Sequence, residues 1–160
     1  MSPGGLPRAP ALVSLSRDHH DALVEVLFLR RAQGRPAAGR RFVDYFQAEV
    51  EGHMADEEDV VLPAVEASDP VGVERIRREH ADLRRVVAQL RGRLEAGGDP
   101  ADLMEEAARL LHDNVRYEER VFFMDVQAAL PPPEMERVGQ ALDEHRAARG
   151  VVAACRIPPR

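Results

Sequence analysis

The residues of this chain best suited to chemistry are histidines on the faces of expected helices. His19, His53 and His80 each have mostly apolar neighbours three, four and seven residues away, so each is expected to point into a hydrophobic core. A lone histidine in a core is usually hydrogen-bonded to a nearby polar group. Three on separate helices each need such a partner in a low-dielectric interior, and one shared metal ion satisfies all of them.

Two carboxylates extend this pattern. Glu57 follows His53 by one helical turn, and Glu118 lies on a stripe that is otherwise apolar apart from Asn114. A buried carboxylate needs a cation or a hydrogen-bond donor. Mixed imidazole and carboxylate ligands from facing helices suit iron or manganese, and zinc is compatible with them. The competing interpretation makes Glu118 an edge residue paired with an arginine.

The other charged positions are interpreted as structural or solvated. His112 has mostly polar neighbours at helical spacing and is expected at the surface. His145 is expected to be half-buried, with no link to the metal site. Charge at helical spacing usually marks a solvated face, which is our expectation for Glu58, Glu119 and the Arg84-Arg85 pair.

Four long segments with a helical period position these side chains, and no segment has a sustained strand alternation. They span about residues 12–31, 40–66, 70–95 and 100–129, and a shorter fifth helix spans about 134–149. Asp69-Pro70 and Asp99-Pro100 each predict an N-cap followed by proline at the first helical position, whereas Pro63 should kink or end the second helix. Short connections make neighbouring helices antiparallel. The fold predicted is an all-α, up-down-up-down four-helix bundle with a short C-terminal fifth helix.

The length, net charge and cysteine count of the chain indicate its class of protein. The 160 residues fit one domain, with a flexible segment at 1–10, the bundle at 11–150 and a tail at 151–160. A formal net charge of -6 argues against nucleic acid as a partner. No apolar run approaches the roughly 20 residues of a membrane span, and the first residues lack the apolar core of a signal peptide. Cys155 is the single cysteine, so we expect a reducing compartment and a cytoplasmic protein.

Four motifs carry a resemblance to a known family. They are Leu-Ser-Arg-Asp-His-His-Asp-Ala-Leu at 15–23, His-Met-Ala-Asp-Glu-Glu-Asp-Val-Val-Leu-Pro at 53–63, Glu-His at 79–80, and Asn-Val-Arg-Tyr-Glu-Glu-Arg-Val-Phe-Phe at 114–123. Together they resemble the bacterial hemerythrin-like, or HHE cation-binding, family over about residues 11 to 149. The resemblance implies a hemerythrin-like bundle with a non-haem iron site, usually di-iron, that serves in O₂ binding, iron handling or sensing.

The resemblance also implies a ligand set. It implies imidazole ligands at His19 (or His20), His53 and His80, and bridging carboxylates at Glu57 and Glu118. The chain departs from the family at three positions, all on one side of the site or close to it. Asn114 stands where the family has a histidine, Ile76 where its O₂ carriers have a second histidine, and Met124 where it usually has a proline. We therefore predict a strong single-metal site or a weak, asymmetric pair, which disfavours a reversible O₂ carrier.

Two functions remain open at this stage. The first is a metal-binding protein of iron handling or O₂- or NO-related sensing, with one or two iron ions, or manganese or zinc in their place. The second is a degenerate bundle without metal that acts as an interaction module. An enzyme is not expected, because neither the Glu-x-x-His of ferritin-like sites nor the His-Glu-x-x-His of zinc peptidases occurs in the chain. The sequence identifies no protein partner.

Overall fold

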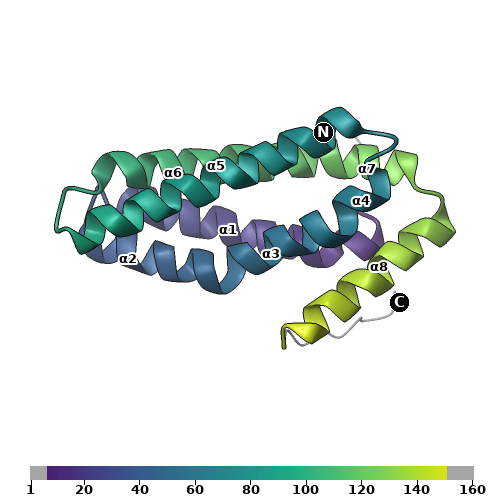
Figure 1. Cartoon of the computed structure of the whole chain (residues 1–160), viewed down its shortest axis with the longest axis horizontal. Helices are drawn as coiled ribbons and strands as arrows, with labels where there is room; N and C mark the ends of the chain where they lie inside the picture. Colours follow the sequence, from purple (N-terminus) through teal and green to yellow (C-terminus); the bar gives the residue numbers. More distant parts are fainter. Residues whose placement is uncertain (1–6, 151–160) are drawn as a thin grey trace.

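The structure is a computed structural model and describes residues 7–150, all of whose regular elements are helical. Four rods lie side by side, and a fifth helix crosses one end of them (Figure 1). The first rod is the 3₁₀ turn η1 (Pro10–Leu12) with α1 (Val13–Arg31). The second is continuous through α2 (Pro36–Tyr45), the π-helical η2 (Phe46–Val50), α3 (Glu51–Asp56), the π-helical η3 (Glu57–Val61) and α4 (Leu62–Val65). The third is α5 (Pro70–Glu95). The fourth is α6 (Ala101–Tyr117), the π-helical η4 (Glu118–Phe122) and α7 (Phe123–Ala129), and the fifth helix is α8 (Pro132–Ala148).

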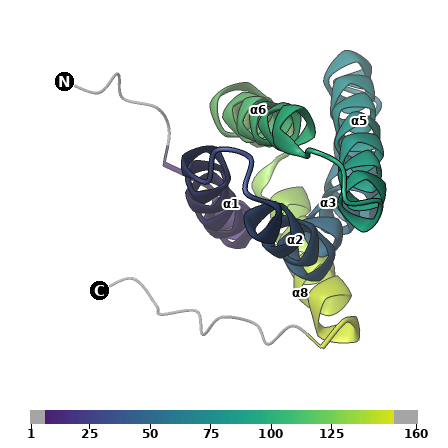
Figure 2. The same cartoon turned by 90° about the vertical axis from the view of Figure 1, so that its left-hand side faces the viewer.

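The four rods form a closed ring. Helix α1 packs against α6 and α2, and α5 packs against the same two helices from the other side. The view along the bundle shows the four rods around a common interior (Figure 2). The short connections between consecutive rods make their directions alternate. The predicted all-α, up-down-up-down bundle with a C-terminal fifth helix is confirmed. None of the described helices is both long enough and apolar enough to cross a membrane.

The helix ends follow the predicted punctuation with three shifts at helix starts. Helix α2 begins at Pro36, about four residues earlier than predicted, and α8 begins at Pro132, about two residues earlier. Asp69 caps α5, because its side chain accepts a hydrogen bond from the Gly72 backbone N–H at 2.9 Å. Asp99 accepts in the same way from Ala101 at 3.0 Å, but the helix begins at Ala101, one residue later than predicted. Pro63 is the second residue of α4, and the rod ends within one turn of it, as expected for a residue without a backbone N–H.

The hydrophobic core is divided into two clusters along the bundle. In α1, Ala22 belongs to one cluster and Leu15 to the other, and in α5 the same is true of Leu83 and Ile76. A layer of buried polar side chains lies between the clusters at the level of His19 and His80. The apolar clusters cover this polar layer at both of its ends along the bundle, so its buried charged groups lie in low-dielectric surroundings.

Helix α8 is fastened to the bundle by its apolar residues. Met135, Val138 and Leu142 join the cluster that contains Leu15, and Leu142 is only 1% exposed.

The N-terminal end of the described chain is also held to the bundle. Arg8, just before η1, donates to the backbone oxygen of Glu119 at 2.8 Å. The predicted C-terminal tail with Cys155, and the first six residues of the predicted N-terminal segment, lie outside the described residues.

Candidate metal centre

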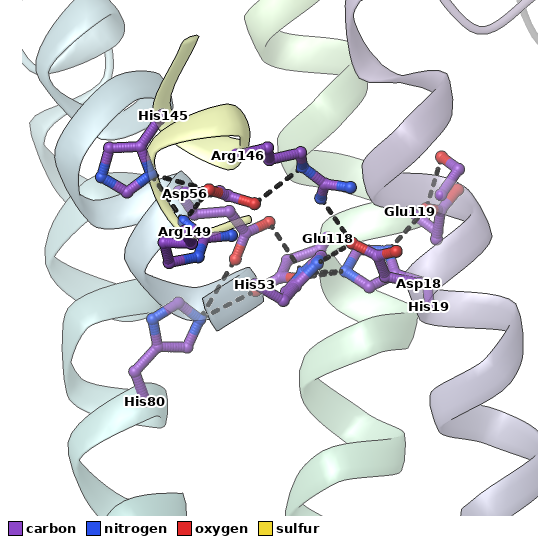
Figure 3. A network of polar contacts seen from close by, with 12 residues as sticks. Asp18, His19, His53, Asp56, His80, Glu118, Glu119, His145, Arg146 and Arg149 are labelled. Atoms are coloured by element: carbon purple, nitrogen blue, oxygen red, sulfur yellow. Dashed lines mark hydrogen bonds and ion pairs between the residues drawn. The ribbon is translucent and has the colours of Figure 1, made fainter. Parts of the chain in front are cut away.

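Four buried side chains from three rods converge in the polar layer. They are His19 on α1, His53 on α3, Glu57 at the start of η3 and Glu118 at the start of η4. One potential ligand atom from each lies within 4.8 Å of the others. Figure 3 shows His19, His53 and Glu118 pointing toward one another from their separate helices. This spacing places two imidazole nitrogens and two carboxylate oxygens around a common point.

His80 lies on the other side of the two carboxylates. Its Nε2 atom is 3.3 Å from Glu57 Oε2 and 3.4 Å from Glu118 Oε1, and its side chain is fully buried. In Figure 3 it approaches Glu118 from the side opposite His19. Two ligand positions would therefore share the carboxylates, with two imidazoles on one side and one on the other.

The two carboxylates stand at the starts of π-helical segments. Glu57 opens η3 and Glu118 opens η4. A π-helical turn closes from residue i to i+5, so it rotates less per residue than an α-helix, and such turns occur frequently at functional sites. Consecutive residues can then face the interior together. The expectation that Glu58 and Glu119 lie on solvated faces is wrong for this reason, since both are only partly exposed and turn toward histidines.

Each of the three imidazoles is anchored in the same way. Its Nδ1 atom meets a carboxylate oxygen, which leaves Nε2 directed at the centre. The pairs are His19 with Glu119 at 2.6 Å, His53 with Asp18 at 3.0 Å, and His80 with Glu58 at 2.8 Å. Metal-binding histidines in proteins commonly donate their second ring N–H to a carboxylate, which orients the ring and raises its basicity. His19 is further held by stacking on Phe123, with ring centroids 5.3 Å apart.

These outer carboxylates are balanced by arginines, whereas the inner ones are not. Arg8 pairs with Glu119, Arg146 with Asp18, and Arg84 with Glu58. Arg84 was also expected on a solvated face, and its contacts with Glu58 correct that expectation. Within residues 7–150, no arginine pairs with Glu57 or Glu118, whose ion pairs are all with histidines. With neutral imidazoles the inner layer carries two negative charges, which one divalent cation balances.

Buried polar atoms without a hydrogen-bond partner indicate whether the site fits a metal ion. Both oxygens of Glu57, Oε2 of Glu118 and Nε2 of His80 are buried and have no partner in hydrogen-bond geometry. Histidine nitrogens nevertheless approach the three carboxylate oxygens at 2.8, 3.3 and 3.5 Å. The Nε2 atoms of His19 and His53 are 2.9 Å apart. If each ring donates its Nδ1 proton outward, both of these nitrogens present lone pairs to each other. Because an unpaired buried polar group costs about 1–3 kcal/mol, a cation coordinated by these atoms fits the donor set.

The pKa values reflect the same negative field. Burial opposes protonation of His53, but the charge of Glu57 and the hydrogen bond to Asp18 outweigh it and raise its pKa to about 10. Burial likewise opposes ionisation of Glu118, yet the hydrogen bonds from His19 and His80 lower its pKa. Without a metal, protons on the imidazoles therefore balance the inner carboxylates, so protons and a cation compete for one site.

Three predicted site residues lie outside the group of four: His80, described above, Asn114 and His20. The buried amide of Asn114 donates to Glu118 Oε1 at 2.7 Å and to Glu79 Oε2 at 3.1 Å, so its NH₂ group occupies an oxygen of the central carboxylate. His20 is exposed and does not reach the cluster. Of the two adjacent histidines, His19 is the one that lies in the centre.

Two further histidines lie away from the ligand atoms. His112 is at the surface beside Asp113, as expected. His145 was expected to have no link to the site, and this needs correction. Its Nδ1 and Nε2 atoms meet Asp56 at 2.8 Å and Asp59 at 3.0 Å, and Asp56 also pairs with Arg146. His145 thus belongs to the polar network that joins α8 to the bundle beside His53.

The sequence reasoning missed three functional residues of the outer layer. Asp18, Glu58 and Glu119 each adjoin a candidate ligand in the sequence: Asp18 precedes His19, and the glutamates follow Glu57 and Glu118. The Glu-Glu pair that occurs in both the second and the fourth rod could have indicated that the second glutamate also faces the histidines. That interpretation requires π-helical turns, which the α-helical period of the sequence does not reveal.

A cavity of about 510 Å³ reaches the centre from one side. Its wall includes His19, His53 and Asn114, together with Arg146 of α8 and Arg149, the residue that follows this helix. The volume falls in the usual range of small-molecule sites. Small molecules therefore have a route to the side of the centre that carries two imidazoles.

Comparison with known proteins gives one match. The family model described as the hemerythrin HHE cation binding domain matches residues 11–126. No curated protein and no solved structure matches the chain. The matched residues include all four convergent side chains and His80, whereas α8 lies beyond them.

Proposed function

Because the chain belongs to the hemerythrin HHE cation-binding family, we propose that it is a non-haem iron protein with an asymmetric site. The stronger position is formed by His19, His53, Glu57 and Glu118. The single observation that carries the proposal is the convergence of these four buried side chains within 4.8 Å. The family supports cation binding; the choice of iron is our proposal, since two imidazoles and two carboxylates suit iron or manganese, with zinc as the competing metal.

The charge of the inner layer supports one tightly held ion. Glu57 and Glu118 are fully buried and have no arginine partner among the described residues. With neutral imidazoles, two buried carboxylates without a counter-charge would be strongly unfavourable. One divalent cation removes this penalty, whereas a second would leave the layer with an excess of positive charge.

A second position beside His80 is the weaker one. It has one imidazole and oxygens of the two shared carboxylates. Ile76, one turn before His80, is fully buried in an apolar cluster, and the Asn114 amide donates to Glu118 instead of supplying an imidazole. With two ligands missing from this side, reversible O₂ transport is not the function that we propose.

The role that fits best is iron handling or the sensing of O₂ or NO. Iron supplies redox change and affinity for diatomic gases when it is bound. The chain's own residues orient the three imidazoles through Asp18, Glu58 and Glu119, cover the polar layer with apolar clusters at both of its ends, and leave one cavity as a route for a small ligand.

Anaerobic loading with Fe²⁺, followed by removal of loose metal and elemental analysis, tests this proposal. We expect about one tightly held iron per chain and its loss in His53→Ala. His112→Ala, which removes a surface histidine, should retain the metal. Two equally tight irons would refute the asymmetry. A protein that holds no iron and keeps its thermal stability would instead be the metal-free bundle that acts as an interaction module.

A further inference from the structure

Helix α8 lies outside the residues that match the family, yet its Arg146 contacts Asp18, the carboxylate that holds His53. We infer that Arg146 of α8 is a positioning residue that holds His53 in place through Asp18, so that α8 docking and metal binding reinforce each other. This inference rests on the proposed metal site.

The first step is a relay of direct contacts. Arg146 Nη2 donates to Asp18 Oδ2. The same oxygen accepts from His53 Nδ1 at 3.0 Å. His53 then directs Nε2 toward Glu57 and His19. One carboxylate oxygen thus joins the guanidinium of α8 to a candidate ligand (Figure 3).

The second step is that Arg146 joins two rods. Its Nε forms an ion pair with Asp56 Oδ2 at 2.8 Å, without hydrogen-bond geometry, on the same helix as His53. Its Nη2 donates a hydrogen bond to Asp18 on α1. Asp56 is fully buried, and the Arg146 side chain is only 12% exposed. A guanidinium that contacts two carboxylates ties together the two helices that carry them. Arg146 therefore links α1 to α3 at the level of the centre.

The third step is that the contacts of Arg146 depend on the docking of α8. Arg84, which supports His80 through Glu58, lies on α5 within the bundle. Arg146 reaches Asp18 and Asp56 only when α8 is docked on the bundle. Helix α8 docks through Leu142 and its apolar neighbours. His145 and Arg149 reinforce the docking by pairing with Asp56. Detaching α8 would leave Asp56 without these partners and Asp18 without its arginine.

The coupling is reciprocal. If docked α8 favours the orientation of His53 that binds metal, bound metal must favour docked α8 by the same factor. Arg146 and Arg149 also form part of the cavity wall beside His53. Undocking of α8 would therefore widen the route to the centre and, at the same time, leave His53 less firmly oriented.

The first experiment uses the unmodified chain and Co²⁺ as the probe. Hydrogen exchange of the backbone amides in residues 132–148 is measured with and without one equivalent of Co²⁺. We expect the metal to slow exchange throughout α8 by about 5-fold or more. Equal exchange rates in the two states would overturn the coupling, and this measurement depends on no variant.

The second experiment compares substitutions within α8. Arg146→Ala should weaken Co²⁺ binding by about 5-fold or more and shift the visible d–d absorption of the bound ion, because the geometry of His53 changes. Arg146→Lys keeps the charge but loses the planar fork, and it should give an intermediate result. Arg137→Ala, at an exposed position of the same helix, should behave as the unmodified chain.

The outcomes separate the two proposals. If the unmodified chain binds no Co²⁺ and no Fe²⁺, the metal site itself is refuted. If it binds Co²⁺ and Arg146→Ala binds equally well with an unchanged spectrum, the role of α8 alone is refuted. Circular dichroism confirms that the variant keeps the bundle. If it does not, the exchange measurement on the unmodified chain decides.

Discussion

The side-chain amide of Asn114 donates to Glu118 Oε1 at a distance of 2.7 Å. Asn114 therefore occupies one oxygen of the carboxylate that lies between the two halves of the centre. His80 Nε2 is 3.4 Å from the same oxygen. The position that would supply a second imidazole on the His80 side instead supplies a hydrogen-bond donor, and this contact accounts for the asymmetry that we propose.

Replacing Asn114 with histidine should raise occupancy of the second position. The substitution adds an imidazole and frees Glu118 Oε1 from the amide. After anaerobic Fe²⁺ loading, elemental analysis should give more iron per chain than in the unmodified protein. Asn114→Ala is the control, since it frees the oxygen without adding a ligand and should bring no gain. Unchanged iron content in Asn114→His would mean that this position does not face the metal.

Adjacent glutamates should have different effects when changed to glutamine. Glu118→Gln removes a proposed ligand and should abolish tight metal binding. Glu119→Gln removes the partner of His19 Nδ1, and loss of such an outer partner typically weakens binding by about 10- to 100-fold. Isothermal titration with Zn²⁺ measures both affinities. Equal affinities in the two variants would contradict the assignment of inner and outer roles.

The metal-free protein should lose stability as the pH rises. The pKa of His53 is raised from 6.5 to about 10, because the charge of Glu57 and the bond to Asp18 outweigh the opposing effect of burial. Its protonation stabilises the fold fully below pH 6.5, and this contribution is lost as the pH rises through 10. Hydrogen bonds from the histidines lower the pKa of Glu58 and Glu119 to about 2 against burial, so their contribution is lost as the pH falls from 4.5 through 2.

Bound metal should reverse the alkaline part of this dependence. The ion requires neutral imidazoles, so its affinity increases with pH. The melting temperature is measured with chelator and with excess Zn²⁺ at about pH 5.5 and about pH 8.5. We expect the stabilisation by metal to be larger at the higher pH. A stabilisation that is equal at both pH values would argue against coordination by these histidines.

Weakening the packing of α8 on the bundle should lower the free energy of unfolding. Leu142 is 1% exposed in an apolar cluster, whereas Leu27 on α1 is 52% exposed. Leu142→Ala should cost about 2–5 kcal/mol, and Leu27→Ala should change stability by no more than about 0.5 kcal/mol. Urea denaturation of the metal-free protein compares the two. Similar losses in both variants would contradict the packing of α8 on the bundle.

Local patterns explain how much of the fold could be predicted. The period of apolar residues and the Asp-Pro dipeptides placed the helices, because helix faces and helix starts depend on residues close in sequence. The same period placed His19, His53, His80, Glu57 and Glu118 inside the bundle. It failed at Glu58 and Glu119, because it assumes α-helical rotation, and η3 and η4 are π-helical.

The sequence by itself therefore determined the rods, their directions and the identity of the buried imidazoles and carboxylates. Only the tertiary structure decided which carboxylate meets which histidine, and that Arg146 bonds Asp18 across 128 residues of sequence. Such contacts depend on the axial register and separation of packed helices. Those quantities are set by the whole interior at once, and residues near one another along the chain carry little information about them.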